Sequence, residues 1–163
     1  MDDTWTPLDL GVVGPLRDAT RADAERAFAR LMEVRAGRVR TLEALAGTGD
    51  TRALSSWLAT TARALGVERT SDLAVDAALW LGERIISRAA DDGGGLRWEL
   101  YTGVKKSTGY QRAVLTGFRK VDDPRYYVDV AHFVASWLEL CARRRAARED
   151  FLVTIEDTTL ADA

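Results

Sequence analysis

The stretch Leu96-Arg97-Trp98-Glu99-Leu100-Tyr101-Thr102 decides the fold, because apolar and polar side chains alternate along it. A period of two is typical of a β-strand with one buried and one exposed face. After a polar loop comes Gln111–Phe118, whose part Ala113–Phe118 is apolar or small at every position, as expected of a strand covered on both faces. We therefore predict that Leu96–Thr102 and Gln111–Phe118 form an antiparallel hairpin with helices on one face.

A third strand is expected beside this hairpin, because an isolated two-stranded ribbon is only marginally stable in water. The first candidate is Phe151–Ile155, in which Val153, Thr154 and Ile155 are β-branched. The second candidate is Leu8–Val13, which lies among helix-breaking glycine and proline residues.

Two helices are predicted near the N-terminus. The first begins after Thr20, a capping residue followed by an acidic first turn, and ends at Gly47. The second begins at Asp50 or Thr51 and ends at Gly66, since glycine is a common helix terminator.

A third helix is predicted from the capping residue Ser71 to Ala90-Asp91-Asp92, and Gly82 lies inside it. A glycine in a helix interior costs about 1 kcal/mol relative to alanine. Gly82 therefore predicts the close approach of another backbone, most readily that of the sheet.

The last helix is predicted to begin after the capping residue Asp129. It has the clearest amphipathic pattern of the chain, with apolar residues at spacings of three and four. These residues are Val130, Phe133, Val134, Trp137, Leu138 and Cys141.

The expected fold is α+β, with N-terminal helices and a C-terminal helix packed on a small antiparallel sheet built around the central β-hairpin. The 163 residues are enough for one core, and no change in composition marks a second domain. We expect a single domain over 1–163, with an irregular segment at 1–19 and a loose tail at 158–163.

The composition is that of an ordinary globular protein, with 47% hydrophobic and 29% charged residues. The formal net charge of −2 provides no overall field that would attract nucleic acid or an anionic membrane. No stretch approaches the roughly 18 apolar residues of a membrane span, and a cytoplasmic location is expected. Cys141 is the single cysteine, which excludes an internal disulfide, and it is predicted to be buried.

The sequence contains none of the familiar catalytic motifs, such as a Walker loop or a Gly-x-Ser-x-Gly elbow. One hypothesis is a small enzyme with an acid/base pocket between sheet and helices. Its candidate groups are Glu83, Glu99 and the single histidine, His132. The competing interpretation of each is an ordinary side chain in contact with solvent.

The hairpin and its loop combine basic and aromatic side chains, which suit phosphates or acidic surfaces. The candidate binding residues are Arg97, Tyr101, Lys105, Lys106, Tyr110 and Arg112. The leading hypothesis is a non-enzymatic protein-binding or accessory module, of the immunity type, that contacts another protein through the exposed hairpin face. Self-association into a homo-oligomer is a further option. A third hypothesis adds Arg143–Arg148 and makes this a weak nucleic-acid-binding module, which the balanced net charge disfavours.

Four aspartates flank the base of the hairpin, and carboxylate oxygens are ligands for hard cations. They are Asp91, Asp92, Asp122 and Asp123. Arg119 and Lys120 are close enough in sequence to neutralise them, so neither a metal site nor a cofactor is predicted.

The chain resembles a group of uncharacterised bacterial domains over roughly Thr20 to Leu138. The resemblance is carried by four short segments: Leu81-Gly82-Glu83, Leu96–Gly103, Gly109–Phe118 and Pro124–Asp129. It implies a small α+β bacterial domain and assigns no activity and no site residue.

Overall fold

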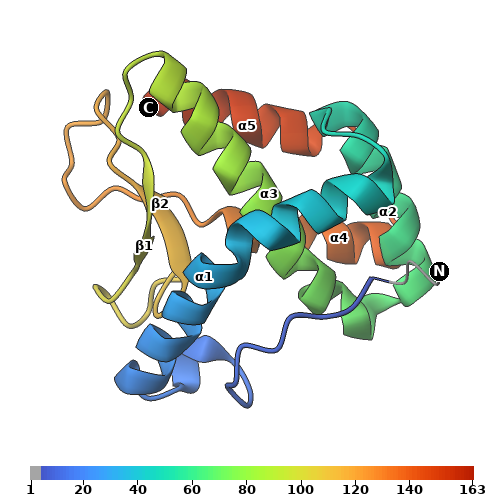
Figure 1. Cartoon of the computed structure of the whole chain (residues 1–163), viewed down its shortest axis with the longest axis horizontal. Helices are drawn as coiled ribbons and strands as arrows, with labels where there is room; N and C mark the ends of the chain where they lie inside the picture. Colours follow the sequence, from blue (N-terminus) through green and yellow to red (C-terminus); the bar gives the residue numbers. More distant parts are fainter. Residues whose placement is uncertain (1–4) are drawn as a thin grey trace.

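The computed structural model describes residues 5–163 and places a β-hairpin on one side of a group of helices (Figure 1). The helices are α1 (Arg21–Ala46), α2 (Thr51–Leu65), α3 (Val67–Asp91), α4 (Val130–Ala142) and α5 (Phe151–Asp162). The hairpin consists of β1 (Arg97–Leu100) and β2 (Ala113–Thr116), and a short 3-10 turn spans Leu16–Asp18. The predicted α+β class is confirmed. Within residues 5–163 no helix is both long enough and apolar enough to span a bilayer.

The predicted hairpin is confirmed, with Trp98 opposite Leu115 and Leu100 opposite Ala113 in an antiparallel register. The expected third strand is reduced to a single bridge on the far side of β2. There Leu115 and Val128 exchange two backbone hydrogen bonds, of 2.9 and 3.0 Å. The sheet of the described residues therefore has the order β1, β2 and one residue of the segment that leads into α4.

Phe151–Ile155 is not a strand, and the prediction for it is wrong. It begins α5, in which Leu152, Glu156 and Thr159 are buried at spacings of four and three, the pattern of a helix. The expected loose tail at 158–163 is also wrong, because α5 continues to Asp162. Leu8–Val13 forms no strand either; residues 5–15 lack regular structure, and residues 1–4 of the expected irregular segment lie outside the described residues.

The helix starts follow their capping residues in three of the four helices for which a cap was expected. Thr20, Asp50 and Asp129 each accept a hydrogen bond from the backbone N–H three residues later. α3 begins at Val67, four residues before the predicted cap Ser71. The reason lies in Gly66, whose positive φ of 79° reverses the chain within one residue, so that α2 and α3 follow each other without a loop.

α3 lies at the centre of the core and presents Trp80, Leu81 and Ile85, all buried, to its neighbours. α4 adds Val134, Trp137 and Leu138, and the two helices make the most extensive helix pair of the fold. Trp80 and Trp137 are buried in this core, while Trp57 and Trp98 are partly buried against it.

Gly82 of α3 lies directly beneath the hairpin. A Cβ at this position would overlap the indole ring of Trp98 on β1. The expected close approach is therefore real, although the partner is a side chain of the sheet and not another backbone. Glu83, the next residue, accepts a hydrogen bond of 2.8 Å from the Trp98 Nε1–H, so both residues fix the indole on the inner face of the hairpin.

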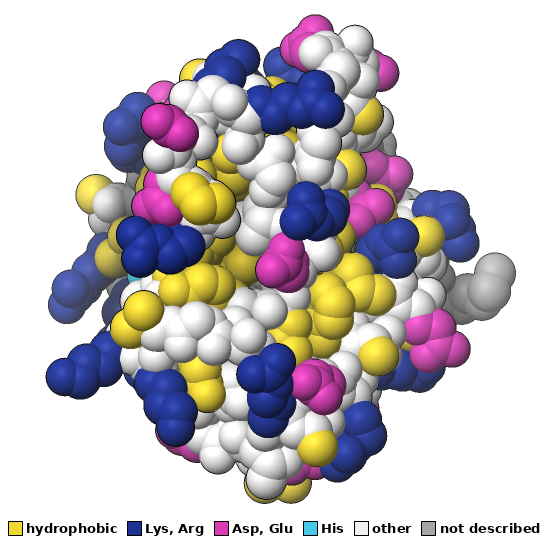
Figure 2. Space-filling view, turned by 90° about the vertical axis from the view of Figure 1, so that its left-hand side faces the viewer, with side chains coloured by type: hydrophobic (Ala, Val, Ile, Leu, Met, Phe, Trp, Pro, Cys, Tyr) yellow, Lys and Arg dark blue, Asp and Glu magenta, His cyan; other side chains and the backbone are white. Residues whose placement is uncertain are grey.

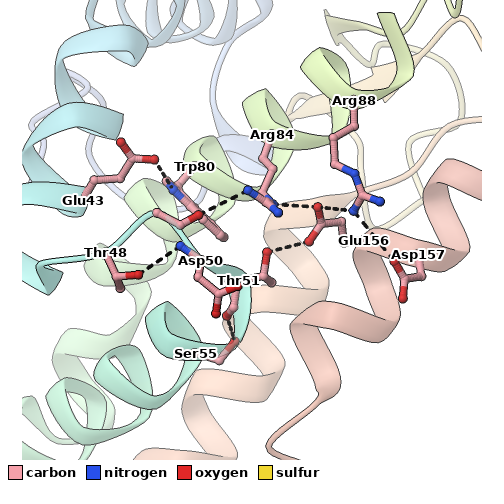
Figure 3. A network of polar contacts seen from close by, with 11 residues as sticks. Glu43, Thr48, Asp50, Thr51, Ser55, Trp80, Arg84, Arg88, Glu156 and Asp157 are labelled. Carbon is pink, nitrogen blue, oxygen red and sulfur yellow. Dashed lines mark hydrogen bonds and ion pairs between the residues drawn. The ribbon is translucent and has the colours of Figure 1, made fainter. Parts of the chain in front are cut away.

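Glu156 joins three helices through its buried carboxylate (Figure 3). It accepts hydrogen bonds from Thr51 Oγ1 at the start of α2 (2.6 Å), and from Arg84 Nε (2.7 Å) and Arg88 Nη1 (2.6 Å) of α3. Burial by itself raises the pKa of Glu156, but these hydrogen bonds outweigh it and hold the pKa below its usual value. A charged, fully partnered carboxylate therefore ties α5 to α2 and α3.

Residues 5–19 are held against the helices by side chains from distant positions. Asp76, 1% exposed, accepts hydrogen bonds from Trp5 Nε1 and from the Arg38 guanidinium. At the other end, the side-chain amide of Gln111 donates to the carbonyl oxygens of Leu16 (2.8 Å) and Ala19 (2.9 Å). The segment therefore follows the surface between the core helices and the hairpin.

Candidate protein-binding cleft

The outer face of the hairpin and the segment 123–127 enclose a cleft of about 420 Å³, which we call the hairpin cleft. Its walls combine four aromatic rings with two arginines and two carboxylates. These side chains are Tyr101, Phe118, Tyr126, Tyr127, Arg97, Arg125, Glu99 and Asp123. The cleft exists because the bridge between Leu115 and Val128 holds the segment that follows β2 beside the hairpin.

The aromatic rings of the hairpin cleft are held in pairs. Tyr101 and Tyr127 have ring centroids 4.3 Å apart at 37°, and Phe118 and Tyr126 have centroids 5.0 Å apart at 78°. The Tyr127 hydroxyl is hydrogen-bonded to Ser107, and the Tyr126 hydroxyl donates to Asp162 of α5 at 3.0 Å. Burial and this hydrogen bond raise the pKa of Tyr126. The rings therefore form a rigid wall in which both hydroxyl groups of the segment 123–127 are anchored.

The charged groups of the hairpin cleft are exposed and only loosely paired. Arg97 contacts Glu99 at 3.3 Å, and Glu99 also accepts a hydrogen bond of 3.0 Å from Thr116 Oγ1. Arg125 contacts Asp123 at 3.4 Å. Exposed pairs of this kind contribute at most about 1 kcal/mol, so a charged partner can replace them at low cost.

The segment 96–127 differs in charge from the rest of the chain. It contains seven basic and three acidic residues, a net charge of +4 against −2 for the whole chain. All four tyrosines and all three lysines of the sequence fall within it. Figure 2 views this side of the molecule and shows patches of hydrophobic side chains bordered by many Lys and Arg side chains, with Asp and Glu between them.

The structure separates the six predicted binding residues. Arg97 and Tyr101 line the hairpin cleft. Lys105 and Lys106 are exposed in the loop beside it, and Tyr110 is half-buried there. The Arg112 guanidinium instead faces Asp129, the capping residue of α4, with 3.4 Å between Nη1 and Oδ2.

The three groups proposed for an acid/base pocket do not meet. Glu83 bonds Trp98 on the inner face of β1 and pairs with Arg35 at 3.2 Å. Glu99 lies on the outer face, because successive residues of a strand point to opposite faces. His132 is exposed and lines a separate cavity of about 370 Å³ between the segment 126–129, α4 and α5. The geometry gives no support to an enzyme that uses these residues together.

The other proposed sites are also dispersed. No group of three or more His, Cys, Asp or Glu residues in the described part of the chain is placed to hold a metal ion. Arg143 and Arg148 follow the C-terminal end of α4, whose first residue adjoins the hairpin. The 13 residues of α4 span about 20 Å, so these arginines lie far from the hairpin. They pair with Glu139 and Asp150, so the two basic regions do not form one surface. Cys141 is buried as predicted, and burial raises the pKa of its thiol.

Sequence reasoning missed Phe118, Arg125, Tyr126 and Tyr127 as site residues. Pro124–Asp129 was noted only for the resemblance, and a local pattern does not reveal which loop lies beside which strand. The restriction of all tyrosines to 96–127 was an available signal, because tyrosine and arginine are enriched at protein interfaces.

No family model matches the chain, and no match was found among curated proteins or solved structures. The resemblance to uncharacterised bacterial domains therefore stays a prediction, and any functional assignment depends on the geometry of the hairpin cleft.

Proposed function

We propose that this protein is a non-enzymatic protein-binding module, an accessory protein of the immunity type, whose contact surface is the hairpin cleft. The observation that carries the proposal is the gathering of four aromatic rings and two arginines around one cleft of about 420 Å³. Tyrosine and arginine dominate the residues that contribute most to binding energy at protein interfaces.

The cleft is well suited to recognition because its aromatic wall is already ordered. The tilted pair of Tyr101 and Tyr127 and the edge-on pair of Phe118 and Tyr126 are in place before any partner binds. Association then loses little side-chain entropy, which is one of the main costs of forming an interface.

Within the cleft, the chemistry favours binding over catalysis. The two carboxylates that line it, Glu99 and Asp123, are both exposed and paired with Arg97 and Arg125. Exposed carboxylates in ion pairs with arginine lack the enclosed setting in which enzymes commonly hold a general acid or base against a substrate.

The proposal is tested by affinity capture from cells of the source organism with matched baits. The cleft variant is Arg97→Glu with Arg125→Glu, and the control is Arg21→Glu with Arg30→Glu on α1. All four arginines are exposed members of exposed ion pairs, and both variants change the net charge equally. We expect a protein that the wild type and the control retain and that the cleft variant loses. Equal capture by all three baits would refute the proposal.

A cross-linking experiment locates the contact independently. A photo-reactive residue is placed at Val104, which lines the cleft and is 62% exposed, or at Val13, which is fully exposed in the N-terminal segment. The captured protein should cross-link from position 104 and not from position 13. The opposite result would place the contact away from the hairpin.

A further inference from the structure

The backbone of β1 has one edge paired with β2 and one edge without a partner. The N–H of Tyr101 donates to the Arg112 carbonyl at 3.0 Å, and the Tyr101 carbonyl accepts from the Gln111 N–H at 2.7 Å. Both backbone groups of Tyr101 therefore point toward the returning strand. Because the direction alternates along an antiparallel ladder, Glu99 and Arg97 also point their backbone groups toward β2.

The residues between them point the other way. Leu115, opposite Trp98 in the register, turns its own N–H and carbonyl away from β1 and toward Val128. Trp98 and Leu100 accordingly direct their N–H and carbonyl groups to the outer edge of β1. In the described residues 5–163, no backbone group of a turn, loop or neighbouring segment forms a hydrogen bond with the N–H or carbonyl of Trp98 or Leu100. Such a row of unpaired groups is a template for another strand.

We propose that an extended acidic segment of a partner protein pairs with this outer edge of β1 and so adds a strand to the sheet. The inference rests on the proposed function and names the mode of binding and the chemistry of the partner. Strand addition is an established way of capturing a peptide, in which main-chain hydrogen bonds provide affinity and alternate side chains provide specificity.

The charge of the surface selects the occupant. The added strand would place every second side chain on the outer face of the sheet, beside Arg97 and Glu99 of β1 and the adjacent Tyr101, and the segment 96–127 as a whole has a net charge of +4. Acidic side chains at those positions are attracted to it. A second copy of this chain would bring an equally basic hairpin to the same edge, so the charges disfavour self-pairing.

The proposal is tested with synthetic heptapeptides of alternating glutamate and valine, using the amide NMR signals of the full chain. The acidic peptide should bind, a peptide with lysine in place of glutamate should not, and binding should weaken as salt is added. Slower hydrogen exchange is expected at the Trp98 and Leu100 amides, and no change at the His132 amide, which already donates to Asp129.

Backbone methylation separates strand addition from simple charge attraction. Only alternate residues of an added strand bond to β1, and in an antiparallel pairing with glutamate on the outer face these are the valines. N-methylation of the valine set should weaken binding by about tenfold or more, and methylation of the glutamate set should have little effect. An equal effect of both sets would overturn strand addition.

A matched pair of protein variants tests the hydrogen bond that the Leu100 N–H of β1 would donate to the added strand. Leu100→Pro removes the outward N–H without breaking a ladder bond, a position where proline is tolerated in an edge strand. Leu100→Ala loses similar packing and keeps the N–H. We expect the proline variant to bind the acidic peptide about tenfold more weakly than the alanine variant, with circular dichroism confirming that both are folded. If both bind equally, or if the free protein associates with itself through β1, the inference fails. Selective capture through the hairpin cleft would still support the proposed function in that case.

Discussion

At the scale of single residues, the contact between Gly82 and Trp98 decides how the hairpin sits on the helices. The sequence indicated that another part of the chain approaches Gly82 closely, because a glycine in the middle of a helix lowers the stability of the helix and needs a reason. It did not indicate that the contact is the Trp98 indole, since helix periodicity says nothing about which strand residue lies above.

Gly82→Ala should destabilise the protein by about 1–3 kcal/mol, because the added methyl group overlaps the Trp98 ring and outweighs the gain in helix propensity. The control is Gly37→Ala in α1, where a Cβ meets nothing within 4 Å. That change should stabilise the protein by up to about 1 kcal/mol. Urea denaturation followed by circular dichroism measures both. A stabilised Gly82→Ala variant would contradict the packing described here.

Glu156→Gln should lower the free energy of unfolding at pH 7 by about 1–3 kcal/mol, because a neutral amide replaces the carboxylate that Arg84, Arg88 and Thr51 bond. The pKa of Glu156 is lowered by folding, so its charge contributes stability above the unfolded-state value of about 4.3. This contribution is lost as the pH falls through the lower native pKa.

The wild type should therefore lose more stability than the Glu156→Gln variant between about pH 5 and pH 2 in urea titrations. Asp157→Asn, an exposed position on the same helix, is the control and should change stability by less than about 0.5 kcal/mol. Parallel acid profiles for wild type and variant would exclude the role given to Glu156.

At the scale of elements, the sequence predicted those helices whose start and stop signals are local. Thr20, Asp50 and Asp129 cap as expected because a cap involves residues three apart. α5 was mistaken for a strand because Val153, Thr154 and Ile155 are β-branched. The buried charge of Glu156 and the contacts with α2 and α3 override that propensity, and neither is visible in a short window of sequence.

Gln111 anchors the N-terminal segment to the hairpin, and its φ of 58° lies in the left-handed region. Gln111→Asn suits that conformation, but the shorter side chain does not reach both the Leu16 and Ala19 carbonyls. Trypsin should therefore cleave after the exposed Arg17 roughly tenfold faster in the variant. Cleavage after Arg30, within α1, is the internal control and should not change. Equal rates at Arg17 would show that other contacts hold the segment.

At the scale of the whole molecule, the sequence predicted the fold class, and two of its six candidate binding residues line the hairpin cleft. Arg97 and Tyr101 were recognised from the hairpin pattern. Arg125, Tyr126 and Tyr127 join them only because Leu115 pairs with Val128, a contact between separate segments that no local pattern encodes. The three acid/base candidates are apart for the same reason, since nothing local showed that Glu83 of α3 contacts the inner face of β1 while Glu99 lies on its outer face.

Cys141 reports on the integrity of the whole core, because the residue is 1% exposed and burial raises the pKa of its thiol. The native protein should react with a maleimide only as fast as it unfolds, and at once in about 8 M urea. A Thr108→Cys variant provides an exposed thiol in the hairpin loop and should react immediately without urea. Rapid labelling of native Cys141 would mean that α4 opens independently of the rest.

The packing of the Trp98 indole against Gly82 affects the kinetics of ligand binding, because it fixes the register of the hairpin. Two strands of four residues have little in their backbones to stop them sliding along each other. A shift of β1 by one residue relative to β2 would turn the indole to the outer face. A shift of two residues would move the indole about 7 Å away from the space beside Gly82 in α3. One alignment is thus selected before any encounter, so mixing with a ligand should give a single fast phase whose rate rises linearly with ligand concentration, without the plateau that marks a prior rearrangement.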